Sequence, residues 1–296
     1  MSSVPPEAKR GYRAIGDYAA IGDCHGAALI AADGGIDWCC LRRFDADPIF
    51  CRLLDAPRGG FLSTIPSAPS TTTRAYLAGT NILRTEFRTS TGRVAITDFM
   101  PVGRVPDAGT HDYVRLRAPG WLVRRIEGVE GRVALHVTYR PSIAFASRPA
   151  RLHEAPDGIT LEDDAVPLRS DLPLRVTGEQ AACTVAVGAG ECRFIVIGRE
   201  AQSATAQRVE ELLAITSAFW REWIEYCRYR GPYGDMVHRS ALALKLMTHA
   251  PTGAPIAAIT TSLPEHIGGS RNWDYRYCWL RDASLLLQAL ASLGYS

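Results

Sequence analysis

The chain has 296 residues, of which 47% are hydrophobic and 22% are charged, and its formal net charge is +2. This length suits two domains, and the composition is that of a globular protein. A near-neutral charge gives no electrostatic reason to expect nucleic acid as a partner. The N-terminus, MSSVPPEAKRGYRAIGDYAA, lacks the apolar run of a signal peptide, and no stretch approaches the length of a membrane helix. We therefore expect a cytoplasmic protein with no membrane partner.

The 8 cysteines form no C-x-x-C pair, and no histidine falls at zinc-finger spacing. Scattered cysteines in a chain without an export signal are typical of reduced, mostly buried thiols. The alternative is a metal or redox site, for which the sequence shows no ligand cluster. From this pattern we expect neither a metal nor a cofactor.

The first half of the chain is rich in signals for short strands. Residues 1–12, with their prolines and charges, predict a loose arm. Two tight-turn signals, Asp33-Gly34-Gly35 and Thr91-Gly92, each separate a pair of apolar segments and so predict β-hairpins. The predicted hairpin strands are Gly26–Ala31 with Ile36–Leu41, and Asn81–Thr89 with Arg93–Phe99.

A repeated phrase, IGDY and then IGDC, occupies Ile15–Tyr18 and Ile21–Cys24. We interpret its two Gly-Asp steps as a pair of turns. The alternative interpretation is that Asp17, Asp23 or His25 lines the mouth of a pocket.

From residue 60 to residue 197 the pattern stays short and β-like. In Gly131–Arg140, alternate residues are apolar, which marks a half-buried strand. The short apolar run Cys192–Ile197 is typical of a buried strand. Many short strands separated by Gly, Pro and Asp turns predict an antiparallel β-sandwich made of two sheets.

Near Ser203 the apolar residues change to helical spacing. Ser203 or Thr205 can cap this helix, and Gly231-Pro232 would end it. A second helix is predicted over Asp235–His249, and its nearly all-round apolar surface suggests that it packs among other helices. A third is predicted over Ala283–Leu293 and would close on Gly294.

The stretch Gly268–Asp282, GGSRNWDYRYCWLRD, places aromatic rings at alternate positions among paired charges. A sugar presents flat C–H patches, which rings cover, and hydroxyls, which Arg and carboxylate groups bind. This mixture therefore favours a carbohydrate site. The alternative is a strand with one buried face and Arg–Asp pairs that only tie loops together. The rings are Trp273, Tyr275, Tyr277 and Trp279, and the charges are Asp274, Arg276, Arg281 and Asp282.

The run APTGAPIAAITTSLPEHIGGSRNWDYRYCWLRDASL (Ala250–Leu285) resembles the start of the catalytic domain of glycoside hydrolase family 15, which holds glucoamylases, glucodextranases and trehalases. IGDYAAIGDCHGAALIAADGGIDWCCLRRFDADPIFCRLLD (Ile15–Asp55) resembles the N-terminal region of its prokaryotic, trehalase-like branch. The likeness implies a mainly β then α fold. Its parts would be an N-terminal β-sandwich over residues 1–202, a linker helix over 203–231, and the first helices of a truncated (α/α)6 barrel over 232–296.

The resemblance also implies an inverting hydrolase that releases glucose from trehalose or related α-glucans. Its glucose-binding motif falls on Trp279, Arg281 and Asp282, and Tyr275 falls on an aromatic position of the same pocket. Other residues of the matching segments would either touch sugar or support the loop. They are Trp273, Arg276, Tyr277, Arg43 and Asp45. Dependence on phosphate or a divalent metal occurs in the trehalase branch, although no ligand cluster for them is visible here.

The chain departs from the family pattern in one respect. Both catalytic glutamates of the family lie well downstream of the glucose-binding motif, whereas this chain ends about one helix after it. Glu265 resembles an ordinary residue of the family's Leu-Pro-Glu phrase. We therefore expect no catalytic residue within this chain and no turnover by the chain alone. The alternative is a non-catalytic module that binds glycan or assembles with a partner through the exposed apolar faces of its last two helices. The sequence does not predict an oligomeric state.

Overall fold

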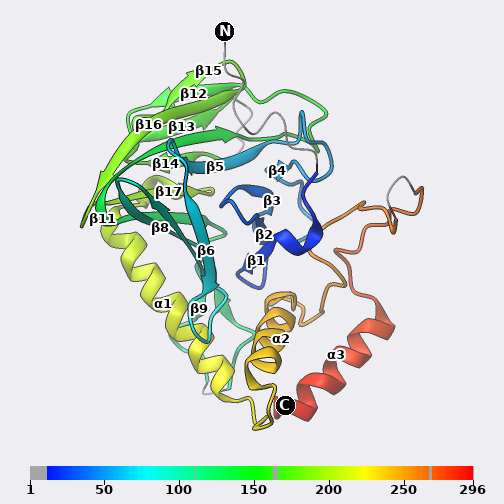
Figure 1. The fold of residues 1–296 in the computed structure, drawn as a ribbon. Coiled ribbons are helices and arrows are strands. Elements are labelled where there is room, and N and C mark those ends of the chain that lie inside the picture. Colours follow the sequence, from blue (N-terminus) through cyan, green and yellow to red (C-terminus); the bar gives the residue numbers. More distant parts are fainter. Residues whose placement is uncertain (1–11, 110, 163–165, 267–268, 296) are drawn as a thin grey trace.

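The computed structural model describes residues 12–109, 111–162, 166–266 and 269–295. The arm predicted over residues 1–12 lies outside this part except for Tyr12. Within these residues the chain forms an antiparallel β-sandwich, which is followed by three α-helices (Figure 1). The predicted fold class is confirmed.

Two antiparallel layers make up the sandwich, and one strand, β11 (Leu122–Arg140), belongs to both. The first layer also contains β1 (Ala19–Gly22), β2 (Ala27–Ile30), β3 (Ile36–Cys40), β4 (Phe50–Cys51), β5 (Phe61–Pro66), β15 (Arg175–Thr177) and β16 (Gln180–Gly188). The second contains β6 (Thr71–Tyr76), β7 (Leu83–Thr89), β8 (Gly92–Phe99), β12 (Leu152–Ala155), β13 (Gly158–Leu161), β14 (Leu168–Ser170) and β17 (Cys192–Ile197). The minor elements are the paired strands β9 (Gly103–Arg104) and β10 (Leu116–Arg117), and the 3-10 turns η2 (Ile15–Asp17) and η3 (Ala201–Ser203).

β11 passes from one layer to the other because its glycines let it bend. Its N-terminal part pairs with β8 and β17, and its C-terminal part pairs with β5 and β16. The register slips between Gly128 and Glu130, the position of a bulge. A Cβ on Gly128 would stand only 1.9 Å from the carbonyl oxygen of Gly188, and Gly131 has a φ of 61°. Side chains other than glycine would therefore strain this bend.

The predicted strand signals are largely confirmed. β2 and β3 form the first hairpin, β7 and β8 form the second, and Cys192–Ile197 is β17. Along β11, the alternate residues Val133, Leu135, Val137 and Tyr139 are buried. The prediction missed the first nine residues of β11, where the consecutive Arg124 and Arg125 obscure the apolar alternation.

A buried ion pair joins the two layers. The Arg124 guanidinium donates to both oxygens of Asp98, at 2.7 and 3.0 Å, and both side chains are fully buried. Asp98 and Arg124 belong to β8 and β11 in the second layer. Arg124 also donates to the Gly34 carbonyl at 2.6 Å and to the Thr64 hydroxyl at 3.2 Å, which belong to the first. One charged group thus ties the layers across the core.

The helices are α1 (Ala206–Glu225), α2 (Gly234–Leu246) and α3 (Leu280–Leu293). Thr205 caps α1 by accepting the Arg208 amide at 3.1 Å, and Gly294 ends α3 with a φ of 99°, so both predicted signals are confirmed. α1 ends before the predicted Gly231-Pro232 stop, α2 ends three residues short of His249, and α3 begins three residues before Ala283. None of the described helices is both long enough and apolar enough to cross a membrane.

α1 and α2 pack against the sandwich. Val209 and Leu212 of α1 pack on Val123 and Val196 of the second layer. Further along α1, tryptophans pack against α2, which also contacts β1. α2 is thus held between α1 and the strands, whereas no residue of α3 is buried.

Replacing Asp98 with alanine would leave the Arg124 guanidinium buried without its carboxylate. We expect Asp98→Ala to lower the free energy of unfolding by about 3–5 kcal/mol, measured by urea denaturation. The matched control is Glu130→Ala, which removes the exposed partner of Arg93. That change should cost less than about 1 kcal/mol. Equal, small losses in both variants would contradict the bridging role of Arg124.

Candidate functional site

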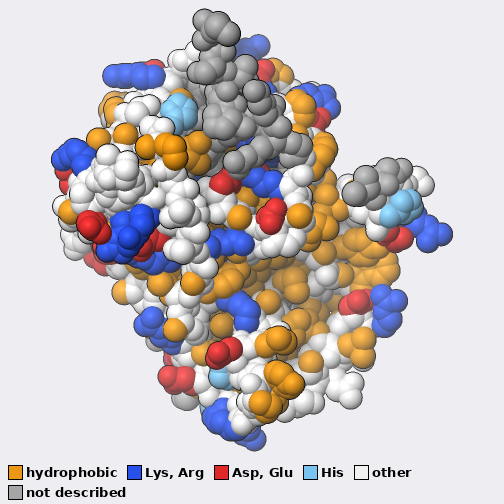
Figure 2. Space-filling model, viewed as in Figure 1, with side chains coloured by type: hydrophobic (Ala, Val, Ile, Leu, Met, Phe, Trp, Pro, Cys, Tyr) orange, Lys and Arg blue, Asp and Glu red, His pale blue; other side chains and the backbone are white. Residues whose placement is uncertain are grey.

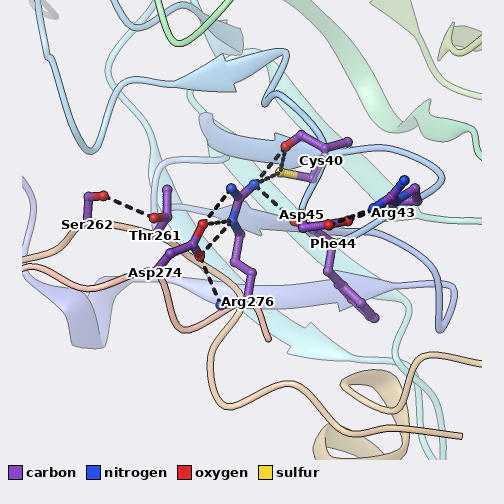
Figure 3. Close-up of polar contacts among 9 residues, drawn as sticks. Cys40, Arg43, Phe44, Asp45, Thr261, Ser262, Asp274 and Arg276 are labelled. Atoms are coloured by element: carbon purple, nitrogen blue, oxygen red, sulfur yellow. Dashed lines mark hydrogen bonds and ion pairs between the residues drawn. The ribbon is translucent and has the colours of Figure 1, made fainter. Parts of the chain in front are cut away.

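The site begins at a buried guanidinium that joins the aromatic segment before α3 to the loop after β3 (Figure 3). Arg276 is 5% exposed. Its Nε and Nη2 donate to the two carboxylate oxygens of Asp274, at 3.0 and 2.8 Å. Its Nη1 donates to the carbonyl oxygens of Phe44 and Ala46, at 3.2 and 2.7 Å. The segment before α3 is thereby fixed to the loop that follows β3.

The surroundings of Arg276 favour the ionised pair. Partial burial acts to raise the pKa of Asp274, but the hydrogen bonds from Arg276 outweigh it and hold that pKa below the ordinary value. The guanidinium also lies 5.9 Å from the ring of Trp38 and 5.5 Å from that of Phe145. Thr261 is paired with Asp274 as an isolated β-bridge. These contacts satisfy a charge that would otherwise be costly to bury.

Main-chain hydrogen bonds extend this attachment. The amides of Ala257 and Ala258 donate to the carbonyls of Tyr277 and Tyr275, at 3.1 and 2.8 Å. Ser262 donates to the Trp273 carbonyl at 3.1 Å. The aromatic segment therefore lies beside residues 257–262 in an extended, strand-like pairing, and this places its rings at fixed positions.

Two of the predicted aromatic residues come together directly. The rings of Tyr275 and Trp279 are stacked, with centroids 5.2 Å apart and planes 30° from parallel. Trp279 is the N-cap residue of α3 and is 39% exposed. The pair offers an accessible aromatic surface at the start of the helix.

Arg281 and Asp282 occupy the first turn of α3. Their side chains form an ion pair of 3.1 Å and are 76% and 44% exposed. A carboxylate in the first turn is also favoured by the helix dipole. The two polar heads thus lie at the surface, next in sequence to the stacked rings, and not in a salt-linked core.

The remaining predicted residues divide into two groups. Trp273 and Tyr277 are 57% and 52% exposed. Arg43 and Asp45 form a bidentate pair of 2.9 and 2.7 Å in the loop after β3. Hydrogen bonding to Asp45, with a smaller contribution from nearby Tyr277, raises the pKa of Arg43. The structure therefore brings Arg43, Asp45, Tyr277 and Arg276 to one place, where the loop after β3 meets the aromatic segment.

Two partners of Arg276, the carbonyls of Phe44 and Ala46, leave no signal in the sequence because they are backbone groups. The sequence leaves open whether Arg276 touches sugar or supports the loop, and the structure shows the supporting contacts. For the Gly-Asp repeat, Asp23 is fully buried and holds a turn by accepting the amides of His25 and Gly26 at 2.9 and 2.8 Å. Asp17 lies in the 3-10 turn η2 and also lines a shallow hollow of about 570 Å³, so the turn interpretation holds for both Gly-Asp steps and the pocket interpretation holds for Asp17 as well.

The structure also bears on the thiols and on metal binding. All eight cysteines are free. Within the residues that the structure describes, no three His, Cys, Asp or Glu side chains are grouped so that they could hold a metal ion.

Comparison with known proteins decides the family. The family described as "Trehalase-like, N-terminal" matches residues 12–181, and "Glycosyl hydrolases family 15" matches residues 231–296. The chain belongs to the trehalase-like branch of glycosyl hydrolase family 15. The resemblance inferred from the two sequence segments is therefore confirmed, and the second match includes the whole predicted glucose-binding motif.

Several trehalases are similar to the chain along nearly all its length. The trehalase of Thermoplasma volcanium is 32% identical over 96% of the chain, and that of Mycolicibacterium smegmatis is 31% identical over 98%. The trehalase of Mycobacterium tuberculosis is 32% identical over 95%. The chain spans only 44–46% of the length of these relatives.

Removing the Arg276 side chain should release the aromatic segment. We expect Arg276→Ala to speed hydrogen exchange at the amides of Ala257, Ala258 and Ser262 by about tenfold or more, because the loss of a buried ion pair weakens the attachment of the strand-like pairing. Mass spectrometry of peptides across residues 256–262 measures the rate. Arg271→Ala is the control, since its side chain is 73% exposed and 3.8 Å from Glu265. Unchanged exchange in Arg276→Ala would show that the segment is held by other contacts.

Proposed function

We propose that the chain provides the N-terminal, glucose-binding part of an inverting α-glucoside hydrolase that acts on trehalose. The observation that carries the proposal is the exposed Arg281–Asp282 pair beside the stacked rings of Tyr275 and Trp279. Similarity to trehalases supports trehalose over other α-glucosides.

The paired charges suit the hydroxyls of a terminal glucose. Asp282 can accept hydrogen bonds from two hydroxyls, while the Arg281 guanidinium donates hydrogen bonds to hydroxyl oxygens. Their separation of 3.1 Å puts donors and acceptors side by side, as neighbouring sugar hydroxyls require. The rings of Tyr275 and Trp279 offer the apolar surface on which C–H patches pack.

In this proposal Arg276 is a positioning residue. Its bonds to Asp274 and to the carbonyls of Phe44 and Ala46 fix the segment that carries the rings. A binding surface that is already ordered loses less conformational entropy when the sugar arrives. The β-sandwich thus contributes to sugar affinity through the loop after β3.

Cleavage with inversion needs two carboxyl groups about 6.5–9.5 Å apart, one of them kept protonated by its surroundings. We propose that this pair belongs to the part of the family's catalytic domain that residues 1–296 do not include. Apart from Asp274, Glu265 is the nearest acidic residue before Trp279 in the sequence. It is exposed, and its carboxylate lies 3.8 Å from the Arg271 guanidinium. That environment is unlike the desolvated site of a catalytic acid.

Residues 1–296 should not release glucose from trehalose or maltose. A coupled glucose assay on the purified chain tests this, run with and without phosphate and Mg²⁺ so that the absence of either does not explain a negative result. Turnover that tracks protein concentration and survives further purification would contradict the proposal that the catalytic carboxyls lie outside residues 1–296.

The chain should still bind sugar through its surface pair. We expect Asp282→Asn and Arg281→Ala each to weaken trehalose binding by about tenfold or more, since a hydrogen bond to a charged group contributes about 1.5–3 kcal/mol. Ligand-observed NMR provides the measurement. Arg271→Ala removes an exposed arginine from the same segment and serves as the control. Equal binding by all four proteins would remove the basis of the glucose assignment.

A second candidate function is a module that assembles with a partner. α3 exposes Leu280, Leu285 and Leu287 at 86%, 62% and 59%. In Figure 2, hydrophobic side chains also gather in the area between the strands and the C-terminal segment. Size-exclusion chromatography with light scattering discriminates the candidates. Concentration-dependent association that a Leu285→Glu, Leu287→Glu variant abolishes would favour assembly, and a stable monomer would count against it.

A further inference from the structure

A cavity of about 1150 Å³ lies away from the Arg281–Asp282 pair. It is partly open to solvent and is lined by the segment around η2, by β1, β2 and β3, by the residues after β4, and by the connection that precedes the aromatic segment. Its volume is slightly above the usual range for small-molecule sites. Much of the wall is apolar and includes Leu29, Leu53, Leu54, Leu263 and Pro264.

A buried carboxylate opens onto this cavity. The Asp37 side chain is 3% exposed. Its Oδ2 accepts the Tyr18 hydroxyl at 2.8 Å and also accepts the Arg13 guanidinium. Its Oδ1 is buried and has no hydrogen-bond donor among the described residues. An acceptor buried without a donor is costly, and such groups in folded proteins usually have a partner.

The position of Arg52 shows what that partner can be. Its Nη1 lies 3.8 Å from Oδ1 of Asp37, which is too far for a hydrogen bond. Because Oδ1 has almost no accessible surface, a ligand hydroxyl reaches it only when a neighbouring side chain shifts. The hydroxyl oxygen would then stand about 2.8 Å from both atoms, donating to Asp37 and accepting from Arg52. The guanidinium lies over the ring of Phe61, 4.4 Å from its centroid, and this contact restricts its orientation.

We propose that this cavity binds a neutral, hydroxyl-bearing ring molecule, such as a sugar or a cyclic polyol. One hydroxyl bridges Asp37 and Arg52, and the apolar face of the ring packs on Leu53 and Leu54. Charged ligands suit the cavity less well. An anion would meet the Asp37 carboxylate, and a cation would meet the guanidinium groups of Arg13 and Arg52.

This site shares no lining residue with the proposed glucose-binding pair. Neither Arg281 nor Asp282 lines the cavity, and none of the residues that hold Arg276 does. Binding at either place is therefore open to separate measurement, and failure of one proposal leaves the other standing.

The test is a titration of the chain, labelled with ¹³C at its leucine methyl groups, with D-glucose. We expect saturable shifts at Leu29, Leu53 and Leu54. The variant Ala56→Phe places a ring inside the cavity without removing a hydrogen bond, and it should abolish these shifts. The matched control is Ala189→Phe at an exposed alanine outside the cavity, which should retain them.

Two further variants identify the groups involved. Asp37→Asn should weaken the titration about tenfold or more, because a charged acceptor is replaced by a neutral amide. Its urea midpoint shows whether the fold is kept, and Ala56→Phe tests the site independently of that result. Asp282→Asn should leave the cavity shifts unchanged. The proposal is overturned by the absence of shifts at Leu29, Leu53 and Leu54, by shifts that persist in Ala56→Phe, or by shifts confined to the leucines of α3.

Discussion

The Arg276 guanidinium is the contact on which the arrangement of the candidate site depends. It receives its counter-charge from Asp274, two residues away, and it donates to backbone carbonyls of Phe44 and Ala46 at the other end of the chain. A planar guanidinium with several fixed donors can satisfy both directions at once, which the compact ammonium of lysine cannot do in the same geometry. The site is therefore built across the boundary between the sandwich and the helical segment.

A second buried arginine connects separate parts of the structure inside the sandwich in the same way. Arg124 takes its counter-charge from Asp98 in its own layer and donates to the Gly34 carbonyl of the other layer. In both cases the carboxylate neutralises the charge, and the remaining donors reach backbone oxygens that lie far away in the sequence. Removing either carboxylate would leave a charge buried in a region of low polarity, so these pairs constrain which arrangements of the elements are allowed.

This construction accounts for the division between buried and exposed residues in the motif. The Arg276 guanidinium is buried and donates to structural partners, whereas the charged groups of Arg281 and Asp282 lie at the surface. The stacked rings belong to Tyr275 and Trp279, which flank Arg276 in the sequence and precede Arg281. A rigid backbone thus presents an accessible arrangement of rings and charges, which is the property required of a sugar-binding surface.

Sequence by itself determined the features that arise from neighbouring residues. Alternation along Val133–Tyr139 predicted a half-buried strand, Asp33-Gly34-Gly35 predicted a hairpin, and Gly294 marked the end of α3, because turn geometry and side-chain periodicity are local properties. Only the tertiary structure decided which arginine supports the motif and that Asp37 and Arg52 lie 3.8 Å apart in the wall of a cavity. Those contacts join residues that are far apart in the sequence and become neighbours only when the segments pack. The backbone partners of Arg276 are likewise set by packing, so local spacing does not predict them.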